Sequence, residues 1–161
     1  MSEMDRWRAL EIEEAGELAD MWRRRGLRII ATAGCFDLLH VGHLRYLQAA
    51  ARLGDRLIVG VSADEVVREI KGPSRPIVPE AERAELVGAL RCVSAAAILR
   101  ERRPVRFVET IRPAVYVKGG DYQGRPLAEQ AAVEACGGVV WFAPYVPGRS
   151  TTELARRIRS G

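Results

Sequence analysis

The sequence contains few of the residues that cross-link small secreted proteins or ligate metals. Its 161 residues include three cysteines and two histidines. The cysteines, Cys35, Cys92 and Cys136, are widely spaced, and no two of them form a CxxC pair. An odd number at this spacing argues against a disulfide framework or a zinc ribbon, and indicates a reducing, cytoplasmic setting.

Targeting segments and long apolar runs are also missing. The N-terminus carries Glu3, Asp5 and Arg6 in place of the basic start and apolar core of a signal peptide. No segment approaches the length that a membrane-spanning helix needs, so we expect no membrane partner. The length fits a single domain over residues 1–161, with residues 1–25 as an N-terminal helical extension.

Aromatic residues make up only 6% of the chain, and the net charge is a modest +4. Arginines cluster in the ranges 23–25, 100–106 and 156–159, without interleaved aromatic side chains on which bases could stack. Scattered clusters of this kind are typical of solvated helix faces. We therefore expect no nucleic-acid partner.

Short apolar runs alternate with helical patterns along the whole chain. Strands are predicted at 27–33, 56–62, 93–99, 114–118 and 139–143, and helices at 3–25, 44–53, 63–70, 79–90, 104–111, 126–136 and from Thr151, with Ser62 capping the third helix. This alternation predicts an α/β fold: a doubly wound, parallel, five-stranded sheet of Rossmann-like type. In such folds ligands bind beyond the carboxyl ends of the strands.

Both histidines lie in one segment, from Gly34 to His43, between the first predicted strand and a helix. Unpaired backbone N–H groups and the helix dipole make such a place suited to phosphate. Two alternatives remain open: a metal pair of His40 and His43 with Cys35 or Asp37 as third ligand, or a purely structural role. Phosphate binding is the favoured interpretation, because no further histidine or nearby second cysteine completes a metal shell.

Three other unusual segments follow strands and are predicted to reach the same sheet edge. They are the cationic loop with Lys71 and Arg75, the run from Lys118 to Asp121, and the run from Gly148 to Thr152 at the start of the last helix. The alternatives are solvated loop charges for the first, a plain strand exit for the second and a simple N-cap for the third. Together the segments indicate a site for a phosphorylated ligand.

The stretch from Gly34 to His43 resembles the HxGH motif of the nucleotidyltransferases related to cytidylyltransferases, and Ser150-Thr151-Thr152 resembles their second phosphate-binding motif. The runs from Lys71 to Pro76 and from Lys118 to Tyr122 are similar to those of the bacterial D-glycero-β-D-manno-heptose 1-phosphate adenylyltransferases. This resemblance implies a nucleotidyltransferase fold and transfer of AMP from ATP to a heptose 1-phosphate, with ADP-heptose and pyrophosphate as products.

The resemblance also implies roles for individual residues. His40, His43 and Lys71 would be catalytic, as donors and cations on the reacting phosphates. The remaining site residues would bind the nucleotide or sugar: Gly34, Cys35, Phe36, Asp37, Gly42, Arg75, Arg83, Lys118, Gly119, Gly120, Asp121, Ser150, Thr151 and Thr152. Asp37 is expected to order the first loop, and Arg83 to add a phosphate contact. Mg²⁺ would arrive with the nucleotide, without dedicated metal ligands from the protein.

Other activities share the same residues. The chain could transfer CMP or GMP, or use another small phosphorylated acceptor such as glycerol 3-phosphate, or it could be a nucleotide- or RNA-binding module without catalysis. The family often carries asparagine where this chain has Ala33. The sugar kinase fused to some relatives is absent, so a separate kinase is expected to supply the sugar phosphate. An N-terminal helix with Trp7 and Trp22 is compatible with a homodimer.

Overall fold

The computed structural model of the protein describes residues 8–144, 147 and 150–160. The strands are β1 (Ile29–Gly34), β2 (Arg56–Ser62), β3 (Ala95–Leu99), β4 (Val115–Gly119) and β5 (Val139–Ala143). The helices are α1 (Ile12–Arg24), α2 (Val41–Ala51), α3 (Asp64–Lys71), α4 (Glu80–Gly88), α5 (Val105–Ile111), the short 3₁₀ helix η2 (Gly120–Tyr122), α6 (Gln130–Ala135) and α7 (Thr151–Ser160).

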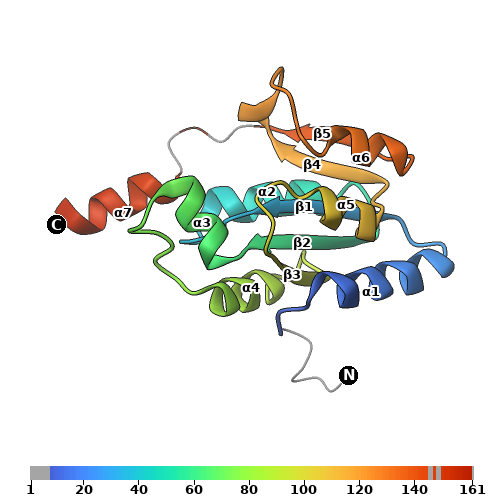
Figure 1. The fold of residues 1–161 in the computed structure, drawn as a ribbon, viewed down its shortest axis with the longest axis horizontal. Helices are drawn as coiled ribbons and strands as arrows, with labels where there is room; N and C mark the ends of the chain where they lie inside the picture. Colours follow the sequence, from blue (N-terminus) through green and yellow to red (C-terminus); the bar gives the residue numbers. More distant parts are fainter. Residues whose placement is uncertain (1–7, 145–146, 148–149, 161) are drawn as a thin grey trace.

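The strands form one parallel sheet in the order β3-β2-β1-β4-β5 (Figure 1). The chain runs outward from β1 through β2 to β3, and then returns to the other side of β1 for β4 and β5. Between β1 and β4 the direction of winding therefore switches, which is where doubly wound sheets open a crevice for ligands. The predicted doubly wound α/β fold is confirmed.

Successive strand residues pack on opposite faces of this sheet. Ile30, Val59 and Val117 face a core closed by α2 and α4, whereas Ile58 and Tyr116 face a core closed by α1, α5 and α6. Because both faces are covered, the strands are apolar along nearly their whole length. This explains why the strands stand out in the sequence.

Several element boundaries differ from the prediction. Helix α1 begins at Ile12, after a capping box of Glu11 and Glu14, so residues 8–11 are not part of it; residues 3–7 of the predicted helix, with Trp7, lie outside the described residues. Leu10 before it is extended and bridges Ala97 of β3. Ser62 belongs to β2, and the N-cap of α3 is Ala63, so the predicted serine cap is wrong. Helix α6 is shorter than predicted, because the stretch before Gln130 forms turns.

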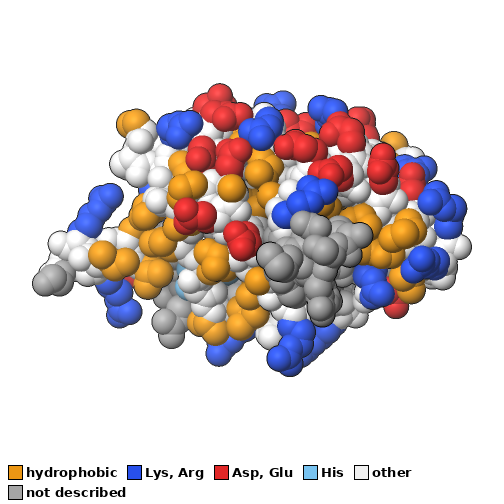
Figure 2. Space-filling model, turned by 90° about the horizontal axis from the view of Figure 1, so that it is seen from below, with side chains coloured by type: hydrophobic (Ala, Val, Ile, Leu, Met, Phe, Trp, Pro, Cys, Tyr) orange, Lys and Arg blue, Asp and Glu red, His pale blue; other side chains and the backbone are white. Residues whose placement is uncertain are grey.

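The face that carries α1 and α4 shows acidic and basic side chains interspersed, without a continuous basic stripe (Figure 2). All three cysteines are free thiols. Among the described residues, no helix is both long and apolar enough to cross a bilayer.

Candidate functional site

Two adjoining cavities open at the carboxyl ends of the strands. One, of about 380 Å³, lies over the ends of β1, β2 and β4, and is called the strand-end cavity. The other, of about 400 Å³, lies between the starts of α2 and α7, and is called the helix-start cavity. The two share a wall made of His43, Tyr46, Lys71, Gly119, Asp121 and Thr151. Residues from all four predicted segments therefore meet around one space.

The two histidines form a stacked pair at the N-terminus of α2. Their ring centroids are 3.8 Å apart and the rings are inclined by 23°. His40 is the N-cap residue, and its Nδ1 accepts hydrogen bonds from the backbone N–H groups of Gly42, at 3.1 Å, and His43, at 3.4 Å. His43 Nδ1 accepts in turn from the backbone N–H of His40 at 3.4 Å.

These hydrogen bonds determine which ring nitrogen carries the hydrogen. Because Nδ1 of each imidazole is an acceptor, the neutral ring holds its hydrogen on Nε2. Each histidine therefore presents one Nε2–H donor without needing a positive charge. The structural role considered for the pair and the phosphate-binding role are thus compatible, since capping uses Nδ1 and phosphate binding would use the Nε2–H groups.

The electrostatic surroundings favour the neutral form of His43. Burial, together with His40 and Lys71 nearby, lowers the pKa of His43 from 6.5 to about 4. A bound polyphosphate would reverse part of this shift, because anions stabilise the protonated ring.

Titration of the imidazoles by NMR tests this assignment, and the His40→Asn variant leaves a single histidine for identification. We expect His43 to titrate at about pH 4 in the free protein, and at a higher pH with pyrophosphate bound. The unfolded chain takes up this proton at about 6.5, so the contribution of His43 to stability decreases as the pH falls from 6.5 towards 4. Titration near 6.5 in the free protein would contradict the buried, neutral ring.

Asp37 organises the loop between β1 and α2. Its side chain is buried, and its carboxylate accepts hydrogen bonds from Arg75 Nε at 2.7 Å and from the backbone N–H groups of Ile77 and Val78. The expected ordering role of Asp37 agrees with this geometry. Arg75 is largely buried in the pair, so the interpretation of Arg75 as a free loop cation is not supported.

Arg83 likewise stabilises the loop between β1 and α2 from a buried position. Its side chain is fully buried, and it donates to the backbone oxygens of Cys35 and Val78 and to Asp64 Oδ1. The expected phosphate contact is therefore not what the structure shows. Arg83 instead fixes the main chain just after β1, where the phosphate-binding segment begins.

Close packing of the Phe36 ring against the main chain explains why the segment after β1 has glycine at position 34. Phe36 has a left-handed φ of 49°, and its ring lies 3.0 Å from the position that a Cβ on Gly34 would occupy. Any larger residue at position 34 would displace the ring, which itself contacts His43 at a centroid distance of 5.4 Å. Gly34 thus allows the loop to turn beneath the histidines.

Tyr46 and Thr32 hold the floor of the crevice together. The backbone pairing of β1 with β4 ends at Thr32 and Val117. There the Tyr46 hydroxyl and Thr32 Oγ1 lie 2.6 Å apart, and both are within 3.0 Å of the backbone oxygen of Val117, so one hydroxyl donates to the other, which in turn donates to Val117. Burial raises the pKa of the Tyr46 hydroxyl, so it stays a neutral donor. Sequence reasoning missed both residues, because this contact joins segments far apart in the chain.

The start of α7 closes the helix-start cavity. Ser150 Oγ accepts from the backbone N–H of Glu153, as an N-cap does, and Thr151 Oγ1 donates to the backbone oxygen of Leu38. Thr152 lines the cavity. Gly148 and Arg149, predicted to support this turn, lie outside the described residues. Ser150 is therefore an N-cap residue of α7, and it also lines the helix-start cavity.

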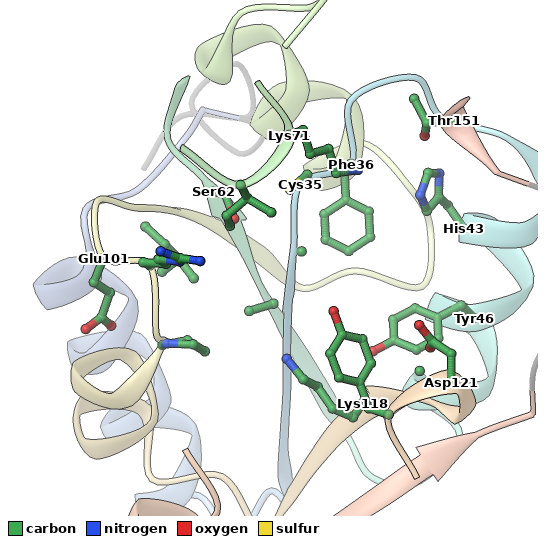
Figure 3. Close-up of a pocket in the computed structure, with 18 residues that line it drawn as sticks. Cys35, Phe36, His43, Tyr46, Ser62, Lys71, Glu101, Lys118, Asp121 and Thr151 are labelled. Carbon is green, nitrogen blue, oxygen red and sulfur yellow. The ribbon is translucent and has the colours of Figure 1, made fainter. Parts of the chain in front are cut away.

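Lys71 and the run after β4 complete the walls (Figure 3). Lys71 is the last residue of α3, not a loop residue, and it lines both cavities. Gly119 and Asp121 also line both cavities, Lys118 lines the strand-end cavity and Gly120 the helix-start cavity. Tyr122, the last residue of the Lys118–Tyr122 motif, lines the strand-end cavity as well, together with Arg102, which was not among the predicted site residues.

The donor set does not fit a resident metal ion. Among the described residues, no group of three or more histidine, cysteine or acidic side chains is placed to hold one. The metal-pair alternative for His40 and His43 thus has no third ligand in Asp37, whose carboxylate is used by Arg75 and two backbone N–H groups.

Comparisons with known proteins identify the family of the chain. The Cytidylyltransferase-like family model matches residues 31–153. The bifunctional protein HldE of Syntrophotalea carbinolica is 44% identical over 146 residues, which are 91% of this chain and 30% of that protein. HldE of Geotalea uraniireducens is 48% identical over 139 residues, 86% of this chain and 28% of that protein. The chain therefore spans less than a third of these relatives.

A solved structure shows the same fold. The lipopolysaccharide core biosynthesis protein from Thermoplasma volcanium superposes with a TM-score of 0.62 at 30% identity, over 75% of this chain and 98% of that one. Fold and site together define a nucleotidyltransferase. The chain belongs to the cytidylyltransferase-like family, as the resemblance of its HxGH segment implied.

Proposed function

We propose that the protein transfers AMP from ATP to a heptose 1-phosphate, forming ADP-heptose and releasing pyrophosphate. One observation carries the proposal: the histidine pair, Lys71, the run from Lys118 to Asp121 and the start of α7 all line two connected cavities. The heptose acceptor is supported by the Lys118–Tyr122 motif and by the similarity to HldE proteins.

In the proposed reaction a phosphate oxygen of the sugar phosphate attacks the α-phosphorus of ATP. A new P–O bond forms, the bond to the β-phosphate oxygen breaks, and pyrophosphate leaves with the bonding electrons. With a second pKa of about 6, the attacking phosphate is largely dianionic at neutral pH, so the nucleophile needs no strong base. Catalysis therefore depends on positioning the two substrates and on stabilising the negative charge of the reacting phosphates.

The residues of the helix-start cavity suit this work. The Nε2–H groups of His40 and His43 would donate to oxygens of the α-phosphate and the leaving group, where negative charge increases. Lys71 would offset the charge of the triphosphate, and the first-turn N–H groups of α7 would bind its terminal phosphates. Mg²⁺ would be carried by the nucleotide phosphates, since no group of three or more histidine, cysteine or acidic side chains in the described part of the chain is placed to hold it.

A pyrophosphate-release assay tests the proposal directly. Purified protein is mixed with heptose 1-phosphate and, separately, with ATP, CTP or GTP. We expect release with ATP that depends on the sugar phosphate, and ADP-heptose as the product by mass spectrometry. Exclusive use of CTP with a polyol phosphate such as glycerol 3-phosphate would overturn the choice of substrates, and absence of turnover with every pair would overturn the proposed enzyme activity.

The proposed partners follow from the reaction. A sugar kinase would supply the heptose 1-phosphate, because the proposed reaction consumes a sugar that is already phosphorylated.

A further inference from the structure

Lys118 at the end of β4 does not present a free positive charge to the cavity. Its Nζ lies 2.8 Å from Glu129 Oε1, and the side chains of Lys118 and Glu129 are only 15% and 4% exposed. Glu129 is the N-cap residue of α6 and lies below the cavity surface, outside its lining. The ammonium group also lies 4.7 Å from the centroid of the Tyr122 ring and 6.0 Å from that of Tyr116.

Lys118 is also separated from the residues suited to polyphosphate. It lines the strand-end cavity, whereas His40, Ser150 and Thr152 line the helix-start cavity and are not part of the strand-end lining. Figure 3 shows His43, Lys71 and Thr151 around one side of the space and Lys118 on the opposite side, with Tyr46 and Asp121 nearer to Lys118. The two ends of the site thus differ in the charge that they offer.

We propose that Glu129 is a positioning residue, which neutralises Lys118 and fixes it as a donor to an uncharged, hydroxyl-bearing part of a substrate. That part is a sugar ring, either the ribose of the nucleotide or the ring of the acceptor. The inference rests on the proposed function, and it adds which portion of the substrates this wall recognises and which buried residue sets that preference.

The charge balance of the pair supports this preference. A phosphate beside Lys118 would meet the buried carboxylate of Glu129 as well, so the attraction to the ammonium would be largely cancelled. A lysine ammonium has three N–H donors, and the ion pair with Glu129 holds the group in place. Its N–H groups can donate to neutral hydroxyl oxygens, and the partly exposed Tyr122 ring beside them offers an apolar face for a sugar ring.

A set of matched variants tests the positioning role. Glu129→Gln keeps the shape and an acceptor oxygen but removes the charge that compensates Lys118. Lys118→Met with Glu129→Leu replaces the whole pair by apolar side chains, a change that buried ion pairs commonly tolerate without loss of the fold. Glu134→Gln removes an exposed carboxylate from the same helix, one that only accepts from Gln130, and serves as control.

Steady-state kinetics with both substrates gives the decisive measurement. We expect Glu129→Gln and the double variant to raise one KM by about tenfold, the scale of one charge-assisted hydrogen bond, with kcat within about twofold of wild type. A raised KM for ATP assigns the ribose to Lys118, and a raised KM for the sugar phosphate assigns the acceptor ring. Glu134→Gln should change neither.

Binding of inorganic pyrophosphate separates a sugar-binding wall from a phosphate-binding wall. We expect calorimetry to show that the double variant binds pyrophosphate as wild type does. Weaker pyrophosphate binding, or a fall in kcat with both KM values unchanged, would overturn the inference by placing Lys118 on the reacting phosphates. Kinetics and binding identical to wild type in both variants would overturn it too.

The same variants distinguish failure of the inference from failure of the proposed function. If wild-type protein releases no pyrophosphate with any substrate pair, the proposed function fails. Calorimetric titration of ATP, CTP, GTP and heptose 1-phosphate then tests the inference alone. Unchanged affinity of Glu129→Gln for every one of these ligands that wild type binds would overturn it, and weaker binding of one ligand, with unchanged pyrophosphate binding, would support it.

Discussion

Replacement of His43 by alanine is expected to reduce kcat for pyrophosphate release by at least about a hundredfold, the scale of losing one donor to transition-state charge. His43 lies on the wall that the two cavities share, and its Nε2–H is left for a ligand because Nδ1 accepts from the backbone of His40. KM for either substrate should change far less than kcat, since the donor acts mainly as the bond to the leaving group breaks.

His40 allows the catalytic and structural contributions to be separated. His40→Ala removes both the Nε2–H donor and the cap of α2, and should lower kcat about a hundredfold while costing about 1 kcal/mol of stability. His40→Asn restores a capping acceptor, because asparagine is among the best N-cap residues, but lacks a donor at the Nε2 position. It should recover the stability and not the turnover.

Turnover and thermal unfolding measured on His43→Ala, His40→Ala and His40→Asn separate the catalytic role of the histidines from their structural role. Recovery of turnover by His40→Asn would show that His40 acts only through the helix start. Near-wild-type turnover in both alanine variants would contradict the donor mechanism altogether.

Asp37→Asn is expected to destabilise the protein by about 3–5 kcal/mol, because it leaves the buried Arg75 guanidinium without its counter-charge. The amide also has a single acceptor oxygen for a site that receives Arg75 Nε and the backbone N–H groups of Ile77 and Val78. Urea unfolding at neutral pH measures the loss. The loop that carries the histidines should loosen at the same time, since Asp37 links it to the segment before α4.

Asp20→Asn is the matched control for this prediction. Asp20 also pairs with arginines, Arg23 and Arg112, but its side chain is 40% exposed. Exposed pairs contribute at most about 1 kcal/mol, so the control should unfold close to wild type. Equal, small losses of stability in both variants would show that burial adds nothing to the contribution of the Asp37–Arg75 pair.

The fold follows from the sequence because its strands are buried on both faces. Continuous apolar runs such as 56–62 and 139–143 coincide with β2 and β5 to the residue. Helix ends were harder to predict where tertiary contacts decide them. Just before α1, which starts at Ile12, Leu10 bridges Ala97 of β3, a contact that no local pattern encodes.

Site residues were predictable where a sequence motif places them beside a strand end. They were not predictable where a contact with another side chain or with the backbone decides the role of the residue. His40, His43 and Lys71 line the cavities as expected. Arg83 looked like a phosphate ligand, because the sequence does not show that Asp64 and two backbone oxygens use its donors. Glu129 was missed for the related reason that the sequence does not show its pairing with Lys118.

The extended residue before α1 has a consequence for how the sheet behaves in solution. β3 is the last strand on its side, and an uncovered outer strand offers unpaired N–H and C=O groups to other chains. The Leu10 backbone takes up two of these groups, accepting from Ile98 N–H and donating to the Ala96 oxygen. The Leu10 segment therefore blocks pairing of β3 with a strand of another molecule. It protects the sheet from edge-to-edge aggregation and has no part in catalysis.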